Sequence, residues 1–172
     1  MSSLACAVES LDSDAVISYG DLLFRSYVLR DLVESKADFS VVVDSLMSGS
    51  SNRTVRDFAY CSRGDDRGLF GTPVLLERVT SAADAERAPH GRWIGILNVS
   101  RAGLAKLKAT VKTLRSEPSF DALDMPALLN ALIAAGAKIE VLYVHGHWRG
   151  VNDLDDLREA VDFAHAQGPF AR

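Results

Sequence analysis

The most constraining feature of this sequence is a pair of short apolar runs that each end in a carboxylate. AVISYGD, residues 15–21, ends in Asp21, and FSVVVD, residues 39–44, ends in Asp44. Near-continuous apolar runs of this kind are typical of strands that are buried on both faces of a parallel sheet. Because ligands of open α/β sheets bind outside the carboxyl ends of the strands, we expect both carboxylates to line one ligand-binding edge.

The rest of the chain alternates between strand-like and helix-like patterns. Strands are predicted over 15–19, 39–43, 57–62, 74–81, 91–100 and 139–144. Helices are predicted over 2–11, 22–35, 100–115, 125–136 and 154–166. This alternation predicts one α/β domain over residues 1–172, with a mostly parallel sheet and helices on both of its faces.

Composition restricts the class of protein and its partners. The chain has 172 residues, of which 48% are apolar and 24% are charged, as expected for one globular domain. The formal net charge of -4 argues against a nucleic-acid partner, because such surfaces are basic. The start has no leader pattern and no apolar run reaches membrane-spanning length, so we expect no membrane partner and a cytoplasmic location.

Asp21 allows two interpretations from the sequence. At the end of a buried strand, its carboxylate could hold a divalent cation and, through that cation, phosphate oxygens. Alternatively, Asp21 caps the helix predicted over 22–35, since Asp is a favoured residue at that position. The local sequence leaves both interpretations open.

Further candidates for ligand binding have similar structural alternatives. Arg56 lies in a polar loop and could meet an anion, although most surface arginines are only solvated. Trp93 could face a ligand cleft or the core. His145 and His147 alternate along an extended segment and would point the same way, but without a nearby third ligand we expect hydrogen bonding or stacking and not zinc.

Several motifs together resemble a known family. AVISYGDLLFRSYVLRDLVES, FSVVVDS, RDFAYCS, GRWIGILNVS, DMPALLNALIAAG and GHWRGVNDLDDLREAVDF resemble, in this order, the nucleotidyltransferase domain of bifunctional phosphoenolpyruvate phosphomutase/nucleotidyltransferase proteins of phosphonate biosynthesis. The resemblance spans nearly the whole chain. It implies a truncated Rossmann-like nucleotidyltransferase sheet and a cytidylyltransferase type of activity, with CTP and a small phosphonate or phosphate as substrates.

The resemblance also implies roles for individual residues. The Asp of the YGD-type motif binds the catalytic magnesium in such enzymes, and that role falls here on Asp21. Asn152 stands in the second metal-binding motif. The resemblance and the positions of the candidates together assign substrate binding to Tyr19, Gly20, Asp44, Arg56, Trp93, His147 and Trp148.

The sequence departs from the family pattern at the phosphate grip and at the second metal motif. No glycine-rich loop of the type GGxGTRL precedes Ala15, and the W-x-D-V-N motif appears as WRGVN, with Gly150 where an acid is expected. Arg92 stands where a glutamate is common. Because one carboxylate holds magnesium poorly, we expect weak or absent activity from this chain alone. We also expect a homodimer or a partner subunit to cover an exposed sheet edge.

Two other functions remain alternatives. The chain could be a non-catalytic interaction or remnant module of a phosphonate-biosynthesis system, in which the sheet persists and the site has decayed. A glycosyltransferase of the nucleotide-sugar type would want a D-x-D at the strand end, where Asp21 is followed by two leucines. The phosphomutase reaction itself belongs to a separate barrel domain.

Overall fold

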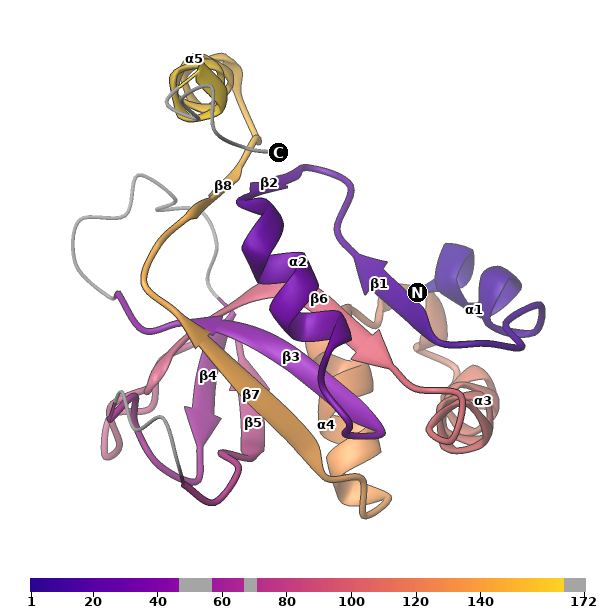
Figure 1. Cartoon of the computed structure of the whole chain (residues 1–172). Coiled ribbons are helices and arrows are strands. Elements are labelled where there is room, and N and C mark those ends of the chain that lie inside the picture. Colours follow the sequence, from indigo (N-terminus) through magenta and orange to yellow (C-terminus); the bar gives the residue numbers. More distant parts are fainter. Residues whose placement is uncertain (47–56, 67–70, 166–172) are drawn as a thin grey trace.

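A computed structural model of the chain describes residues 1–46, 57–66 and 71–165 (Figure 1). Arg56, a predicted substrate-binding residue, lies outside the described residues. The strands are β1 (Ala15–Ser18), β2 (Leu22–Phe24), β3 (Phe39–Asp44), β4 (Phe58–Cys61), β5 (Leu76–Thr80), β6 (Gly91–Val99), β7 (Ile139–Val144) and β8 (Trp148–Gly150). The helices are α1 (Ser2–Val8), α2 (Ser26–Val33), α3 (Leu104–Arg115), the 3-10 turn η1 (Phe120–Ala122), α4 (Met125–Ala134) and α5 (Leu154–His165).

The central sheet is mixed and is organised around β6. Its main path runs β5-β4-β6-β3-β7, and β1 pairs with the end of β6 on the same edge as β4. Of the described strand pairs in this sheet, β3 and β7 are parallel and the others are antiparallel. The predicted mostly parallel sheet is therefore wrong. An apolar run indicates that a strand is buried on both faces, and all six residues of β3 are indeed buried. It does not indicate whether the strand runs parallel or antiparallel to its neighbours.

Helices cover both faces of the sheet, as predicted (Figure 1). Alternation along β3 explains the two cores: Val41 and Val43 pack with residues of α1, α3 and α4, whereas Val42 packs with Val28 and Leu32 of α2. The predicted α/β class with helices on both faces of the sheet is thus confirmed. Within the described ranges, no helix has both the length and the hydrophobicity that crossing a bilayer requires.

The segment after Asp21 differs from the predicted helix over 22–35. Its first residues form β2, which pairs with β8 in a separate two-stranded ribbon, and α2 begins only at Ser26 with Arg25 at its N-cap. Strand pairing with a distant segment overrides the local helical periodicity here. Asp21 therefore does not cap a helix, which removes the structural alternative for this residue.

A bulge in β6 positions Tyr19 at the end of β1. Between the pairs Val41↔Leu97 and Val43↔Trp93, β6 contains two more residues than β3, and Gly95 within this bulge has a φ of +92°. The Gly95 carbonyl accepts a hydrogen bond of 3.0 Å from the Tyr19 backbone N–H. A Cβ atom at Gly95 would overlap the Tyr19 ring, so glycine is required by both conformation and space.

Replacing Gly95 with alanine should destabilise the fold. We expect Gly95→Ala to lower the free energy of unfolding by about 3 kcal/mol, because backbone strain adds to the overlap with Tyr19. The matched control is Gly136→Ala, where φ is +78° but no atom lies within 4 Å of the added Cβ. Strain alone should cost about 1 kcal/mol there. Equal losses in urea unfolding would contradict the proposed packing of Tyr19 on Gly95.

Candidate functional site

The ribbon of β2 and β8 brings the YGD motif and the WRGVN segment together. Leu22 pairs with Gly150, and the Val151 N–H donates a hydrogen bond of 2.8 Å to the backbone carbonyl of Asp21. Asp21 is therefore bonded through its main chain to the residue that precedes Asn152. Its side chain is exposed. Gly20 beside it is exposed as well, and a Cβ atom added there would meet no other atom within 4 Å.

The carboxylate of Asp44 is buried and holds the turn that leads into β8. Oδ1 accepts hydrogen bonds from the N–H groups of Leu46 and Gly146 at 2.9 and 2.8 Å, and Oδ2 accepts one from Trp148 Nε1 at 2.8 Å. Asp44 is 2% exposed and Trp148 is 1% exposed. The two residues that the sequence assigned to substrate binding therefore bond to one another inside the protein, where they hold the turn.

His147 occupies a strained position at this turn. Gly146 and His147 both have positive φ values, 72° and 66°, and only the glycine adopts this conformation without cost. The His147 carbonyl accepts from the Arg25 N–H at 3.0 Å, and its ring shares a hydrogen bond of 2.6 Å between Nδ1 and the Tyr27 hydroxyl. Such strain persists only where surrounding contacts enforce it and is often found at functional sites. The exposed His147 side chain can still meet a ligand.

Tyr19 and Trp93 form the support beneath the YGD turn. Their ring centroids lie 5.4 Å apart, and Trp93 is fully buried with its Nε1 donating to the Ile96 carbonyl at 2.9 Å. Of the two positions that the sequence left open for Trp93, a ligand cleft or the core, the structure places its side chain in the core. The half-buried Tyr19 donates its hydroxyl proton to Asp57 over 3.3 Å. Burial raises the pKa of both groups; the negative charge of Asp57 adds to the rise in the pKa of Tyr19, whereas the hydrogen bond from Tyr19 opposes the rise in the pKa of Asp57.

Magnesium would find a partial set of ligands at this site. The exposed carboxylate of Asp21 lies beside a segment in which Asn152 offers an amide oxygen. The backbone N–H and Nδ2 of Asn152 both donate to Asp156, at 2.9 and 3.1 Å, and these bonds lower the pKa of Asp156. Among the described residues, no group of three or more His, Cys, Asp or Glu side chains could hold a metal ion. These residues fit magnesium only if substrate phosphates and water complete its octahedron.

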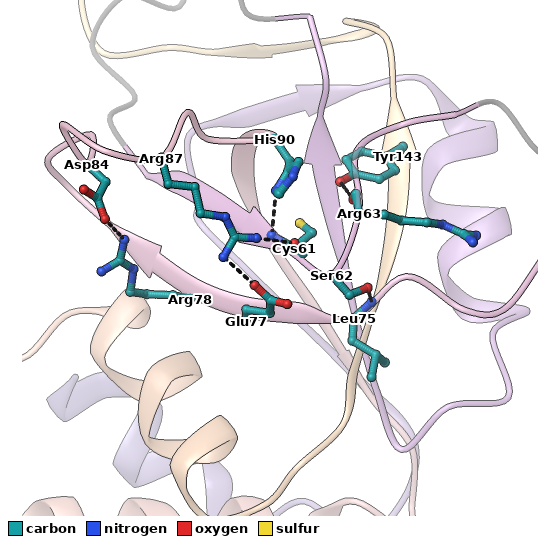
Figure 2. A network of polar contacts seen from close by, with 10 residues as sticks. All are labelled: Cys61, Ser62, Arg63, Leu75, Glu77, Arg78, Asp84, Arg87, His90 and Tyr143. Carbon is teal, nitrogen blue, oxygen red and sulfur yellow. Dashed lines mark hydrogen bonds and ion pairs between the residues drawn. The ribbon is translucent and has the colours of Figure 1, made fainter.

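A second polar cluster, not anticipated from the sequence, ties β4 and β5 to the connection over 81–90 (Figure 2). Arg87 donates to the Cys61 carbonyl and to Glu77, both at 2.7 Å, and the ring of His90 accepts from the Cys61 N–H at 2.9 Å. Burial raises the pKa of the Cys61 thiol to about 11, so it is protonated and not a nucleophile at neutral pH. The cluster therefore has a structural role, in which its hydrogen bonds join β4 and β5 to the connection over 81–90.

A cavity of about 700 Å³ lies beside this cluster, and its lining residues include Tyr143 and His145.

Comparison with known proteins identifies the fold. No protein-family model and no curated relative matches the sequence. Among solved structures, the inositol-1-phosphate CTP transferase from T. maritima matches with a TM-score of 0.65 and 13% identity, over 99% of this chain and 63% of that one. The UTP-bound UGPase from Acinetobacter baumannii matches with a TM-score of 0.64 and 12% identity, over 97% and 56%.

A third structure, assigned as a glucose-1-phosphate thymidylyltransferase from Bacillus anthracis, matches with a TM-score of 0.61 and 16% identity, over 97% of this chain and 60% of that one. The chain has the fold of nucleotidyltransferases that act on sugar phosphates and inositol phosphate. It spans between 56% and 63% of the length of these structures. Identities this low show the fold and not the activity.

The role of Asp44 can be tested by an isosteric change. Asp44→Asn would place an amide donor against a donor from the backbone or from the Trp148 indole, so we expect the free energy of unfolding to fall by about 2–3 kcal/mol. The exposed Asp12→Asn should change it by less than about 0.5 kcal/mol. Chemical denaturation followed by tryptophan fluorescence measures both. An Asp44→Asn variant as stable as wild type would show that the turn is held by other contacts.

His90 should make stability pH-dependent. Burial, with help from Arg87, lowers the pKa of His90 below its ordinary value of 6.5. In the pH window just below 6.5 the unfolded chain binds the proton more readily, so the free energy of unfolding should fall as pH falls. His90→Asn keeps an acceptor for the Cys61 N–H but does not titrate. Unfolding curves of both proteins from about pH 7.5 to 5 should therefore diverge on acidification; parallel curves would contradict this role.

Proposed function

We propose that this chain is the larger part of a metal-dependent nucleotidyltransferase that transfers a cytidylyl group from CTP to a small phosphonate or phosphate. One observation carries the proposal. The β2–β8 ribbon holds the exposed Asp21 beside the segment with Asn152, within a fold shared with known nucleotidyltransferases. The T. maritima protein is a CTP transferase, which supports the choice of nucleotide.

The proposed reaction places specific demands on these residues. An acceptor oxygen forms a bond to the α-phosphorus of CTP while the bond to the β-phosphate oxygen breaks, and pyrophosphate leaves. Magnesium, when bound, supplies the positive charge that neutralises the triphosphate. Asp21 and Asn152 would hold and orient the metal-bound phosphates, and the exposed His147 would contact the acceptor.

Activity of the chain alone should be weak. Asp21 is the single carboxylate that the YGD and WRGVN motifs supply, because Gly150 stands where the family has an acid. The β1 strand, of four residues, pairs with β6, and Val16 on it is 41% exposed. We propose that a second copy or a partner subunit adds to this edge and supplies the phosphate grip. The sequence resemblance supports a link to phosphoenolpyruvate phosphomutase and phosphonate biosynthesis.

A non-catalytic interaction or remnant module is the second candidate. The observation that favours it is the burial of Asp44, Trp93 and Trp148, three residues that the sequence assigned to substrate binding. If the site has decayed, the sheet would persist as a scaffold while nucleotide affinity is lost.

A binding and transfer assay separates the two candidates. The chain is titrated with CTP and magnesium by calorimetry, then incubated with CTP, magnesium and 2-aminoethylphosphonate or phosphocholine while pyrophosphate release is followed. We expect micromolar binding of CTP and slow turnover. Asp21→Asn should lower turnover about a hundredfold, and Asp12→Asn should leave it unchanged. If CTP neither binds nor is turned over, the result favours the non-catalytic module. Equal turnover in Asp21→Asn and Asp12→Asn would contradict the role of Asp21.

A further inference from the structure

Arg149 of β8 and Arg25, the residue that follows β2, stack on one aromatic ring. The guanidinium carbon of Arg25 lies 3.9 Å from the centroid of the Phe163 ring, and that of Arg149 lies 5.2 Å from it. Strand pairing explains the convergence. Leu23 is opposite Arg149, and Arg25 follows Leu23 by two residues, so both arginines share one face of the ribbon. Helix α5 covers this face with Phe163.

The two guanidinium groups have unused hydrogen-bonding capacity. Nη1 of Arg25 and Nε of Arg149 are buried atoms without a hydrogen-bond partner. Within the described ranges neither arginine forms an ion pair, whereas Arg158 on the same helix as Phe163 pairs with Asp155 at 3.0 Å. A buried charged donor without a partner is unfavourable, and a bound oxyanion would relieve this.

A cavity adjoins these groups and limits what can bind. Its volume is about 540 Å³, and its lining residues are Arg25, His147, Arg149, Glu159, Asp162 and Phe163. Strand β8 and the residue after β2 contribute the arginines to this cavity, whereas α5 contributes the exposed carboxylates of Glu159 and Asp162. These carboxylates would repel a triphosphate and would attract an ammonium group.

We propose that this cavity is a binding site for a small molecule with a single phosphate or phosphonate group, which pairs with Arg25 and Arg149. Planar guanidinium groups suit tetrahedral oxyanions because each can donate two parallel hydrogen bonds. The site adjoins the ribbon that Asp21 leads into: Arg149 lies in β8, and the strained His147 lines the cavity. The identification of this anion as the acceptor of the cytidylyl group rests on the proposed function. Binding of the anion to the two arginines does not depend on that function.

The test measures binding without nucleotide or metal. The full chain is titrated by calorimetry with inorganic phosphate, with 2-aminoethylphosphonate and with metal-free CTP. We expect phosphate to bind, 2-aminoethylphosphonate to bind more tightly because Glu159 and Asp162 face its ammonium group, and CTP not to bind in this cavity. Arg25→Gln and Arg149→Gln should each raise the dissociation constant for phosphate about tenfold or more.

The matched control is Arg158→Gln, an arginine of α5 whose side chain is 81% exposed and which does not line the cavity. Circular dichroism confirms that each variant is folded, and Arg149→Lys, which keeps the charge but not the fork, should recover only part of the affinity. No binding of either small anion to wild type, or equal binding in the Gln variants, overturns the proposal. Anion binding without any nucleotidyl transfer would instead refute the proposed function and leave this site standing.

Discussion

The position of the whole candidate site depends on one buried carboxylate. Asp44 ends the central strand β3 and binds the turn after β7 through Gly146 and the indole of Trp148. Because Trp148 begins β8, these bonds fix where β8 starts beyond the end of β7, and β8 in turn fixes β2 and the exposed Asp21 before it. A carboxylate that accepts three hydrogen bonds can remain in the interior, whereas an unpaired one could not.

The YGD turn is thus anchored from two directions. Upstream, Tyr19 packs on the bulge of β6 and bonds to its Gly95 carbonyl, and downstream the main chain of Asp21 bonds to Val151. Rigid support on both sides leaves the side chain of Asp21 itself exposed and available, which is the arrangement that positioned catalytic groups require. The turn therefore combines a fixed backbone with an exposed carboxylate.

The sequence predicted the six strands of the central sheet from their apolar runs, but not the ribbon strand β8, and its motifs predicted that Asp21 and Asn152 would be neighbours. It could not predict strand direction, because burial of β3 is the same in either orientation. It missed β2, whose residues 22–24 have helical spacing but pair with a strand far along the chain. The role of Asp44 could not be predicted for a similar reason. The sequence around a carboxylate at a strand end does not differ between one that faces water and one that accepts a hydrogen bond from an indole N–H. The stacking of two arginines on Phe163 is likewise a tertiary contact without a local signal.

Helix α5 extends beyond the sheet from the end of β8 (Figure 1), and its contact with the ribbon includes the ring of Phe163. Its apolar side chains Leu154, Leu157 and Val161 are 75%, 48% and 47% exposed, so little hydrophobic burial stabilises it. Local stability is consequently uneven along the chain. The amide protons of α5 should exchange with solvent through local opening, at far lower free energy than those of β3 and β6, which open only with the domain.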